Sequence, residues 1–142
     1  MSATRGPSLI AAIEATVHRL LEKLRKELRD LGLTHGEINA LAALRTDSGR
    51  TVADLQKTTG QRASTLTGVL DRLERRGLVE RRPNPRDRRS FTIDLTAAGA
   101  GAAERVAAAF DALDREALGA VSKRSAEGFF EVLNALDEMA RR

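Results

Sequence analysis

The sequence contains no cysteine, tyrosine or tryptophan, and four phenylalanines are its only aromatic residues. Without cysteine the protein cannot form disulfides, thiolate metal sites or thiol-based redox sensors. The two histidines, His18 and His35, stand apart among scattered acids, which is a weak basis for a metal site. We therefore expect neither a metal nor a cofactor.

Long apolar stretches are missing as well. No run approaches the ~18 apolar residues that a membrane span requires, and residues 1–7 lack the apolar core of a signal peptide. We therefore expect a cytoplasmic protein with no membrane partner. The sequence also lacks a G-x-S-x-G motif, a phosphate-binding loop and any motif that joins Ser, His and an acid, so we do not expect an enzyme.

The sequence does contain a compact block of arginine. Its 142 residues are 42% hydrophobic and 31% charged, a composition typical of a single globular domain over residues 1–142. The net charge is +4, but residues 72–89 alone hold eight arginines and three acids, a local charge of +5. A basic patch of this kind favours a polyanionic partner, and the planar guanidinium suits phosphates and guanine edges.

Two helices are predicted before this block. Residues 8–31 carry apolar side chains at steps of three and four, which indicates an amphipathic helix that ends at Gly32. Thr34 and Glu37 then form a capping box that begins a second helix. This second helix is predicted to stop near residues 47–49.

A helix-turn-helix is predicted next. A short helix begins at a Thr51 cap and ends at Gly60, and a longer helix begins at Gln61 or Arg62 and ends before Gly77. The longer helix is polar near its start and rich in arginine toward its end, as suits a recognition helix that meets base edges first and phosphates later. Its apolar side consists of Ala63, Leu66, Val69, Leu70 and Leu73.

A β hairpin is predicted after the recognition helix. Residues 78–81 and 91–95 read as two strands, and residues 82–90 between them hold two prolines, an asparagine and four arginines. A hairpin with a cationic tip in this position is a wing. The predicted fold class is therefore mainly α with a small two-stranded β wing, and residues 34–96 form a winged helix-turn-helix.

The terminal helices have a different predicted role. Thr96 is a plausible cap for a helix over residues 97–120, and a last helix follows with apolar residues from Phe129 to Met139. Residues 8–31 and 97–142 supply more apolar surface than one small winged domain needs. We expect these helices to form a homodimer interface, and the alternative is that they complete an intramolecular core.

With these elements placed, the sequence resembles the MarR (multiple antibiotic resistance regulator) family over most of its length. The resemblance is sharpest over residues 51–99, TVADLQKTTGQRASTLTGVLDRLERRGLVERRPNPRDRRSFTIDLTAAG. Its most specific parts are Leu78 to Arg81, Asp87-Arg88-Arg89 and the run from Leu95-Thr96 to Gly99. The resemblance implies a homodimer on pseudo-palindromic double-stranded DNA, usually a repressor, released in many members by a small-molecule effector.

Candidate DNA contacts follow from position and from the resemblance. Gln61, Arg62, Ser64 and Thr65 are expected at base edges or nearby phosphates, although exposed polar residues there could instead cap the helix. Many members carry a larger polar or basic residue at the position of Gly68. The glycine here could allow close backbone approach, or it could mean that fewer bases are read.

The arginines divide by expected partner. Arg89 matches the family's minor-groove arginine, and Asp87 matches the acid that holds the wing arginine in place. Phosphate contacts are expected from Arg72, Arg75, Arg86 and Arg88. The competing hypothesis is an architectural protein that coats DNA without sequence preference, and only the ratio of specific to non-specific affinity separates the two.

Overall fold

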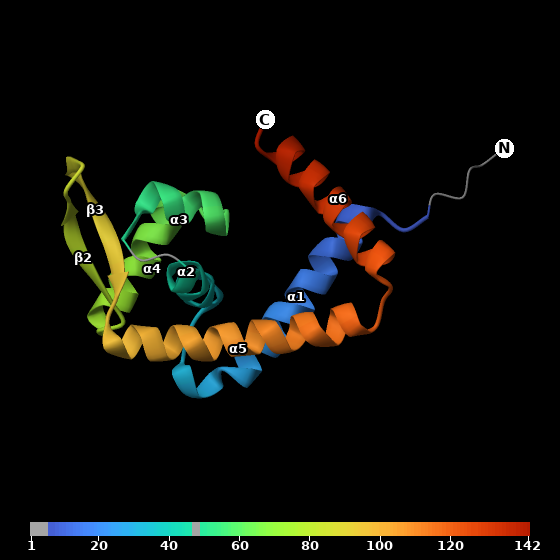
Figure 1. Ribbon diagram of the computed structural model, residues 1–142, viewed down its shortest axis with the longest axis horizontal. Helices are drawn as coiled ribbons and strands as arrows, with labels where there is room; N and C mark the ends of the chain where they lie inside the picture. The colour runs from blue at the N-terminus through green and yellow to red at the C-terminus, as the bar shows by residue number, and fades with distance from the viewer. Residues whose placement is uncertain (1–5, 47–48) are drawn as a thin grey trace. The chain divides into compact units, whose positions relative to one another are not determined.

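The structure is a computed structural model that describes residues 6–46 and 49–142 (Figure 1). Contacts divide the chain into two compact units, residues 1–109 and 110–142. The predicted mainly helical fold class is confirmed. The elements are α1 (Leu9–Glu27), the 3₁₀ turn η1 (Arg29–Leu31), α2 (His35–Thr46), β1 (Arg50–Thr51), α3 (Val52–Thr59), α4 (Ala63–Arg75), β2 (Val79–Asn84), β3 (Asp87–Leu95), α5 (Ala97–Gly119) and α6 (Lys123–Ala140).

The predicted capping signals set the helix boundaries. The Thr51 hydroxyl accepts the Asp54 N–H while the Asp54 carboxylate accepts the Thr51 N–H, so the capping box of α3 is complete. Gly60 ends α3 with φ of 69°, in the left-handed region that glycine enters most readily. Helix α2 ends at Thr46, and the end predicted near residues 47–49 lies partly outside the described residues.

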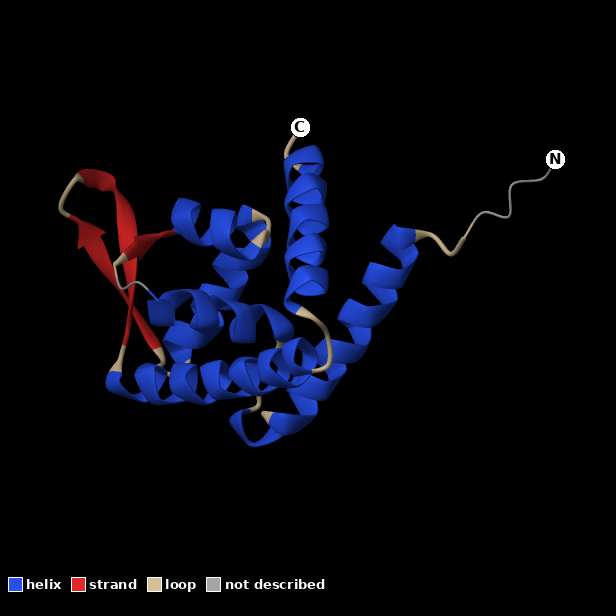
Figure 2. Cartoon of the chain, turned by 45° about the vertical axis from the view of Figure 1, so that its right-hand side comes forward, coloured by secondary structure: helices blue, strands red, loops and turns tan. Residues whose placement is uncertain are grey.

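The wing belongs to a sheet with three strands rather than two. Its three strands are antiparallel in the order β1–β3–β2 (Figure 2). Arg50 pairs with Ile93, and Val79 pairs with Leu95. The predicted hairpin is present, but the turn predicted over residues 82–90 is shorter, because β2 continues to Asn84 and β3 already begins at Asp87. The two-residue strand β1 was missed. A strand this short has no alternating pattern for a sequence to reveal.

The core of the first unit lies where α2, α3, α4 and the sheet meet. Four of the five residues predicted for the apolar side of α4 are buried, but Ala63 is exposed. The prediction for Ala63 was wrong because it is the first residue of α4, and the buried face of this helix begins one turn later at Leu66. The largest fully buried side chains are Ile38, Leu41, Leu44, Leu55, Leu66, Leu70, Leu73, Ile93, Val69 and Val106.

The start of α5 lies directly against the end of the recognition helix. The Thr96 hydroxyl accepts the Gly99 N–H and donates to the Gly77 carbonyl at 2.6 Å, which confirms the predicted cap. A Cβ at Gly99 would lie 1.7 Å from the Leu78 carbonyl oxygen. The L-T-x-x-G run thus brings α5 so close to Leu78 that only glycine fits at position 99.

Much of the apolar surface of the terminal helices is exposed. Helix α6 buries none of its residues, and α1 buries only Leu24. Among residues 6–46 and 49–142, no helix is long and apolar enough to cross a membrane. The exposed large apolar side chains outside the sheet are Leu9, Ile10, Val17, Leu20, Leu118, Val121, Phe129, Phe130, Val132 and Met139.

Candidate nucleic-acid interface

The first turn of α4 presents polar side chains without internal partners. Arg62 is the N-cap residue, but its side chain makes no capping hydrogen bond. Ser64 and Thr65 are exposed, and neither side chain hydrogen-bonds within the described part of the chain. The capping alternative therefore has no support here, and all three side chains are free to meet an external partner.

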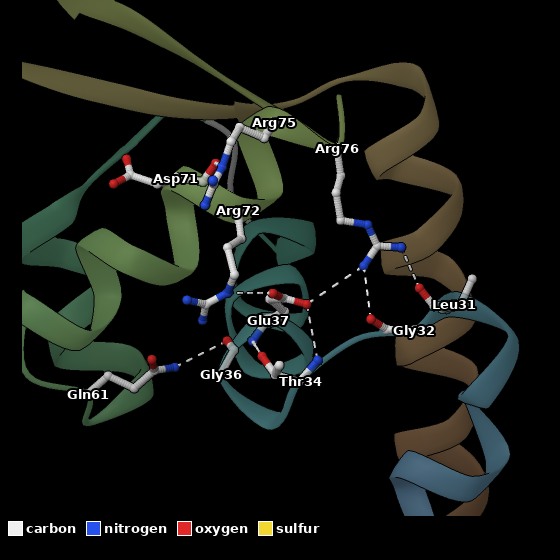
Figure 3. Close-up of polar contacts among 10 residues, drawn as sticks. All are labelled: Leu31, Gly32, Thr34, Gly36, Glu37, Gln61, Asp71, Arg72, Arg75 and Arg76. Atoms are coloured by element: carbon white, nitrogen blue, oxygen red, sulfur yellow. Dashed lines mark hydrogen bonds and ion pairs between the residues drawn. The ribbon is translucent and has the colours of Figure 1, made fainter.

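Gln61 is placed differently from its neighbours. Its Nε2 donates to the Gly36 carbonyl of α2 at 3.3 Å, and its Oε1 is buried without a hydrogen-bond partner (Figure 3). A Cβ at Gly36 would lie 3.3 Å from that Oε1, so the amide is packed closely against α2. The structure thus directs Gln61 toward α2, and a base contact would require its side chain to turn outward.

Arg72 and Arg75, both predicted phosphate contacts, lie on α4 with their side chains exposed. The Nε of Arg72 donates to Glu37 Oε1 at 2.9 Å, while the Nε of Arg75 donates to the Asp71 carbonyl of its own helix at 3.4 Å. At Gly68, an added Cβ would lie 3.6 Å from Arg72 Nη1, an ordinary van der Waals distance. The Arg72 guanidinium therefore lies back over the bare helix surface at Gly68.

Glu37 is the functional candidate that sequence reasoning missed. It is the one buried charged residue in the described part of the chain, with 3% of its surface exposed. The capping box with Thr34 explained its presence, so no second role was expected. A signal was available, because Glu37 precedes Leu41 and Leu44 by four and seven residues and so shares their buried stripe.

Two Asx turns shape the wing tip, and in each a side-chain oxygen accepts a backbone N–H two residues further on. The Asn84 carboxamide oxygen accepts the Arg86 N–H at 3.0 Å, and the Asp87 carboxylate accepts the Arg89 N–H at 3.0 Å. Asp87 was expected to hold the wing arginine, and the structure shows that it binds the backbone of Arg89 rather than its guanidinium. Within the described residues, the side chains of Arg86, Arg88 and Arg89 are exposed and have no hydrogen bond or ion pair.

Other arginines of the basic block hold the unit together. Arg81 of β2 binds Asp71 of α4 at 2.6 Å and also lies 3.6 Å from Glu74. Arg82 pairs with Glu80 and, across the hairpin, lies 3.8 Å from Asp94. The Arg81 pairs fix the hairpin to α4, and the Arg82 pairs lie within the hairpin. The arginines without an internal partner therefore lie at the wing tip and, with Arg62, at the start of α4.

Known proteins resemble this chain in sequence and in fold. A model of the MarR family matches residues 31–90. The multiple antibiotic resistance protein MarR of Escherichia coli (strain K12) is 35% identical over 82 residues, which are 58% of this chain and 57% of that protein. A crystal structure of wild-type apo MarR from E. coli superimposes with a TM-score of 0.73 at 26% identity, covering 93% of this chain and 98% of the other. Over residues 31–90 and in its fold, the chain matches the MarR family.

The structural match covers more of this chain than the sequence matches do. The HTH-type transcriptional repressor NicR of Pseudomonas putida is 38% identical over 71 residues, 50% of this chain and 45% of NicR. The chain thus spans about half the length of the curated relatives it matches. The segment matched by the MarR family model contains every residue predicted to contact DNA, from Gln61 to Arg89.

Proposed function

We propose that this protein is a sequence-specific, double-stranded DNA-binding transcription regulator that acts as a repressor. The proposal is based on the arrangement of exposed polar and basic side chains on α4 and the wing. The exposed, unpartnered side chains of Arg62, Ser64 and Thr65 lie at the start of a recognition helix, and ion pairs fix a wing with uncommitted arginines to that same helix. The helix start offers base readout in the major groove, and the wing offers guanidinium groups to the minor groove and phosphates.

We infer the repressor role, and the absence of enzymatic activity, from the relatives of this chain. NicR is named a transcriptional repressor, and the same role in the cytoplasm is our proposal for this chain. We propose regulation rather than an enzymatic activity.

Dimerisation through the terminal helices, residues 8–31 and 97–142, is part of the proposal. Exposed apolar side chains on α1, on the end of α5 and on α6 support it, because a symmetric dimer buries apolar surface that a single chain leaves exposed. A dimer would also present two recognition helices to two inverted half-sites of a pseudo-palindromic operator.

We propose that the effector is an anionic small molecule, and its structure is left open. A groove of about 520 Å³ beside α1 and η1 is lined by Arg25, Lys26 and Arg29, with Glu22 alongside. Arg25 is paired with Glu22 at 3.0 Å, so Lys26 and Arg29 are the cations that favour an anionic small molecule. Such a ligand would release DNA only to the extent that it binds the non-binding form more tightly.

The experiment is a selection from genomic DNA. The purified protein is incubated with sheared genomic fragments at near-physiological salt, and the retained fragments are sequenced. We expect a few enriched sites with inverted half-sites about ten base pairs apart. Retention without sequence preference would contradict the proposal and favour the architectural hypothesis.

A further inference from the structure

The buried carboxylate of Glu37 connects the recognition helix to the start of α2. Its Oε1 accepts the Nε–H of Arg72 at 2.9 Å (Figure 3). Its Oε2 accepts the Thr34 N–H at 3.0 Å and lies 3.7 Å from Arg76 Nη1. Both oxygens are therefore occupied, and each faces a different part of the fold.

Arg76 extends this cluster toward α1. Its Nη1 donates to the Gly32 carbonyl at 3.1 Å, and its Nη2 donates to the Leu31 carbonyl in η1. The end of α4 is thus fixed to the turn that follows α1 and to the cap of α2. This side of the cluster is structural, since its donors and acceptors satisfy one another.

The Arg72 side of the cluster is different. Glu37 is 3% exposed, whereas the side chain of Arg72 is 46% exposed. Only Nε of Arg72 is committed, and its two terminal amino groups make no hydrogen bond within the described residues. An arginine held by Nε keeps both terminal amino groups for a phosphate, in a fixed orientation.

We infer that Glu37 is a positioning residue for DNA binding, which holds Arg72 by its Nε so that the two terminal amino groups meet a backbone phosphate. Gly68 assists, because its bare surface leaves room for the guanidinium to lie along α4. The inference rests on the proposed function. Charge repulsion alone would predict that the Glu37 carboxylate weakens DNA binding, whereas the inference is that Glu37 strengthens it.

The substitution Glu37→Gln tests this sharply. The Thr34 N–H donates to Oε2, and the Arg76 guanidinium lies 3.7 Å from it, so both favour an oxygen at that position. The new amide nitrogen then faces Arg72 Nε, where two donors meet and no hydrogen bond forms. The cap of α2 is retained and the hold on Arg72 is lost. Binding to an operator fragment obtained from the genomic selection is measured for wild type, Glu37→Gln, Arg72→Ala and the double variant, over a range of salt concentrations.

We expect Glu37→Gln to weaken operator binding about tenfold, the size of one charge-assisted hydrogen bond. In the Arg72→Ala background, Glu37→Gln should have no further effect, because the side chain that it orients is gone. Arg72→Ala itself should lower the slope of log affinity against log salt by about one.

Two results would overturn the inference. Equal or tighter binding by Glu37→Gln would mean that Glu37 only neutralises Arg72. An equal loss in both backgrounds would mean that Glu37 acts through the fold of α2 and α4. Asp30→Asn is the matched control, since it removes a carboxylate from the Asp30–Arg105 pair of η1 and α5 and should leave operator affinity unchanged. If wild type itself binds no site specifically, the proposed function fails instead.

Discussion

Arginine side chains of the basic block differ in what they contact inside the protein. Arg76, Arg81 and Arg82 bind carboxylates or carbonyls that join α4, η1 and the hairpin. Arg86, Arg88 and Arg89 have no such partner in the part of the chain that the structure describes. Charge counted along the sequence cannot separate these groups, because the separation depends on acids brought close by the fold.

Arg89 should therefore be required for DNA binding and dispensable for stability. We expect Arg89→Ala to cost about 1–3 kcal/mol of operator affinity, since it removes a guanidinium suited to a narrow minor groove. Its thermal unfolding midpoint should stay close to that of wild type. Arg81→Ala is the contrast, because loss of its ion pairs to Asp71 and Glu74 should lower the midpoint. Unchanged operator affinity in Arg89→Ala would remove Arg89 from the interface.

Gly99 sets the approach of α5 to the end of α4. In Gly99→Ala the new methyl group would lie 1.7 Å from a backbone oxygen of Leu78, so the backbone must shift. We expect a loss of about 3 kcal/mol or more in the free energy of unfolding, measured by chemical denaturation. Gly101→Ala in the same helix meets nothing within 4 Å and should be neutral or stabilising by up to about 1 kcal/mol. Equal stabilities of the two variants would refute the close approach.

The ends of the helices could be predicted from the sequence, because local chemistry determines them. Thr51, Thr96 and Gly60 lie at the predicted boundaries because caps and left-handed termini depend on a few neighbouring residues. The short strand β1 was not predicted, because its only evidence is its pairing with β3. The placement of Gln61 against Gly36 also depends on tertiary packing between α2 and α4, and the sequence carried no sign of it.

The capping box of α3 gives a pH dependence with a defined sign. Hydrogen bonds from the backbone N–H and the hydroxyl of Thr51 lower the pKa of Asp54 below its ordinary value. A carboxylate whose pKa is lowered by folding stabilises the protein at pH values above its ordinary pKa of about 4. This stabilisation is lost as the pH falls through the pKa of the folded state. We expect Asp54→Asn to lower the unfolding midpoint at pH 7, and the difference from wild type should shrink as the pH falls below about 4.

The control is Asp111→Asn. Asp111 is an exposed carboxylate of α5 with no hydrogen bond or ion pair to any described residue. Its replacement should leave the midpoint unchanged at each pH. A difference between Asp54→Asn and wild type that stayed constant down to strongly acidic pH would contradict the capping role of the Asp54 charge.

At the scale of the whole molecule, unburied apolar surface on the terminal helices supports a dimer. Phe129 is 52% exposed on α6, a helix that buries none of its own residues. Apolar periodicity in the sequence indicated these helices, but it could not show which apolar residues stay exposed within one chain.

Phe129→Glu should therefore weaken dimerisation. We expect light scattering to show a shift toward monomer at micromolar concentration, since two buried charges would face each other across a symmetric contact. Phe91→Glu is the matched control, because Phe91 of the wing is similarly exposed at 53% and lies outside the terminal helices. A dimer that persisted in Phe129→Glu, or was lost equally in Phe91→Glu, would count against an interface on α6.

Whether this protein recognises a particular DNA sequence is decided by the ratio of two affinities. The affinity for the best genomic site should be measured beside the affinity for a scrambled duplex of equal length and composition, at the same near-physiological salt concentration. A specific regulator should prefer its site by roughly a thousandfold or more. A ratio close to one would mean that the protein binds DNA through its arginines without sequence preference, and it would rule out a sequence-specific regulator.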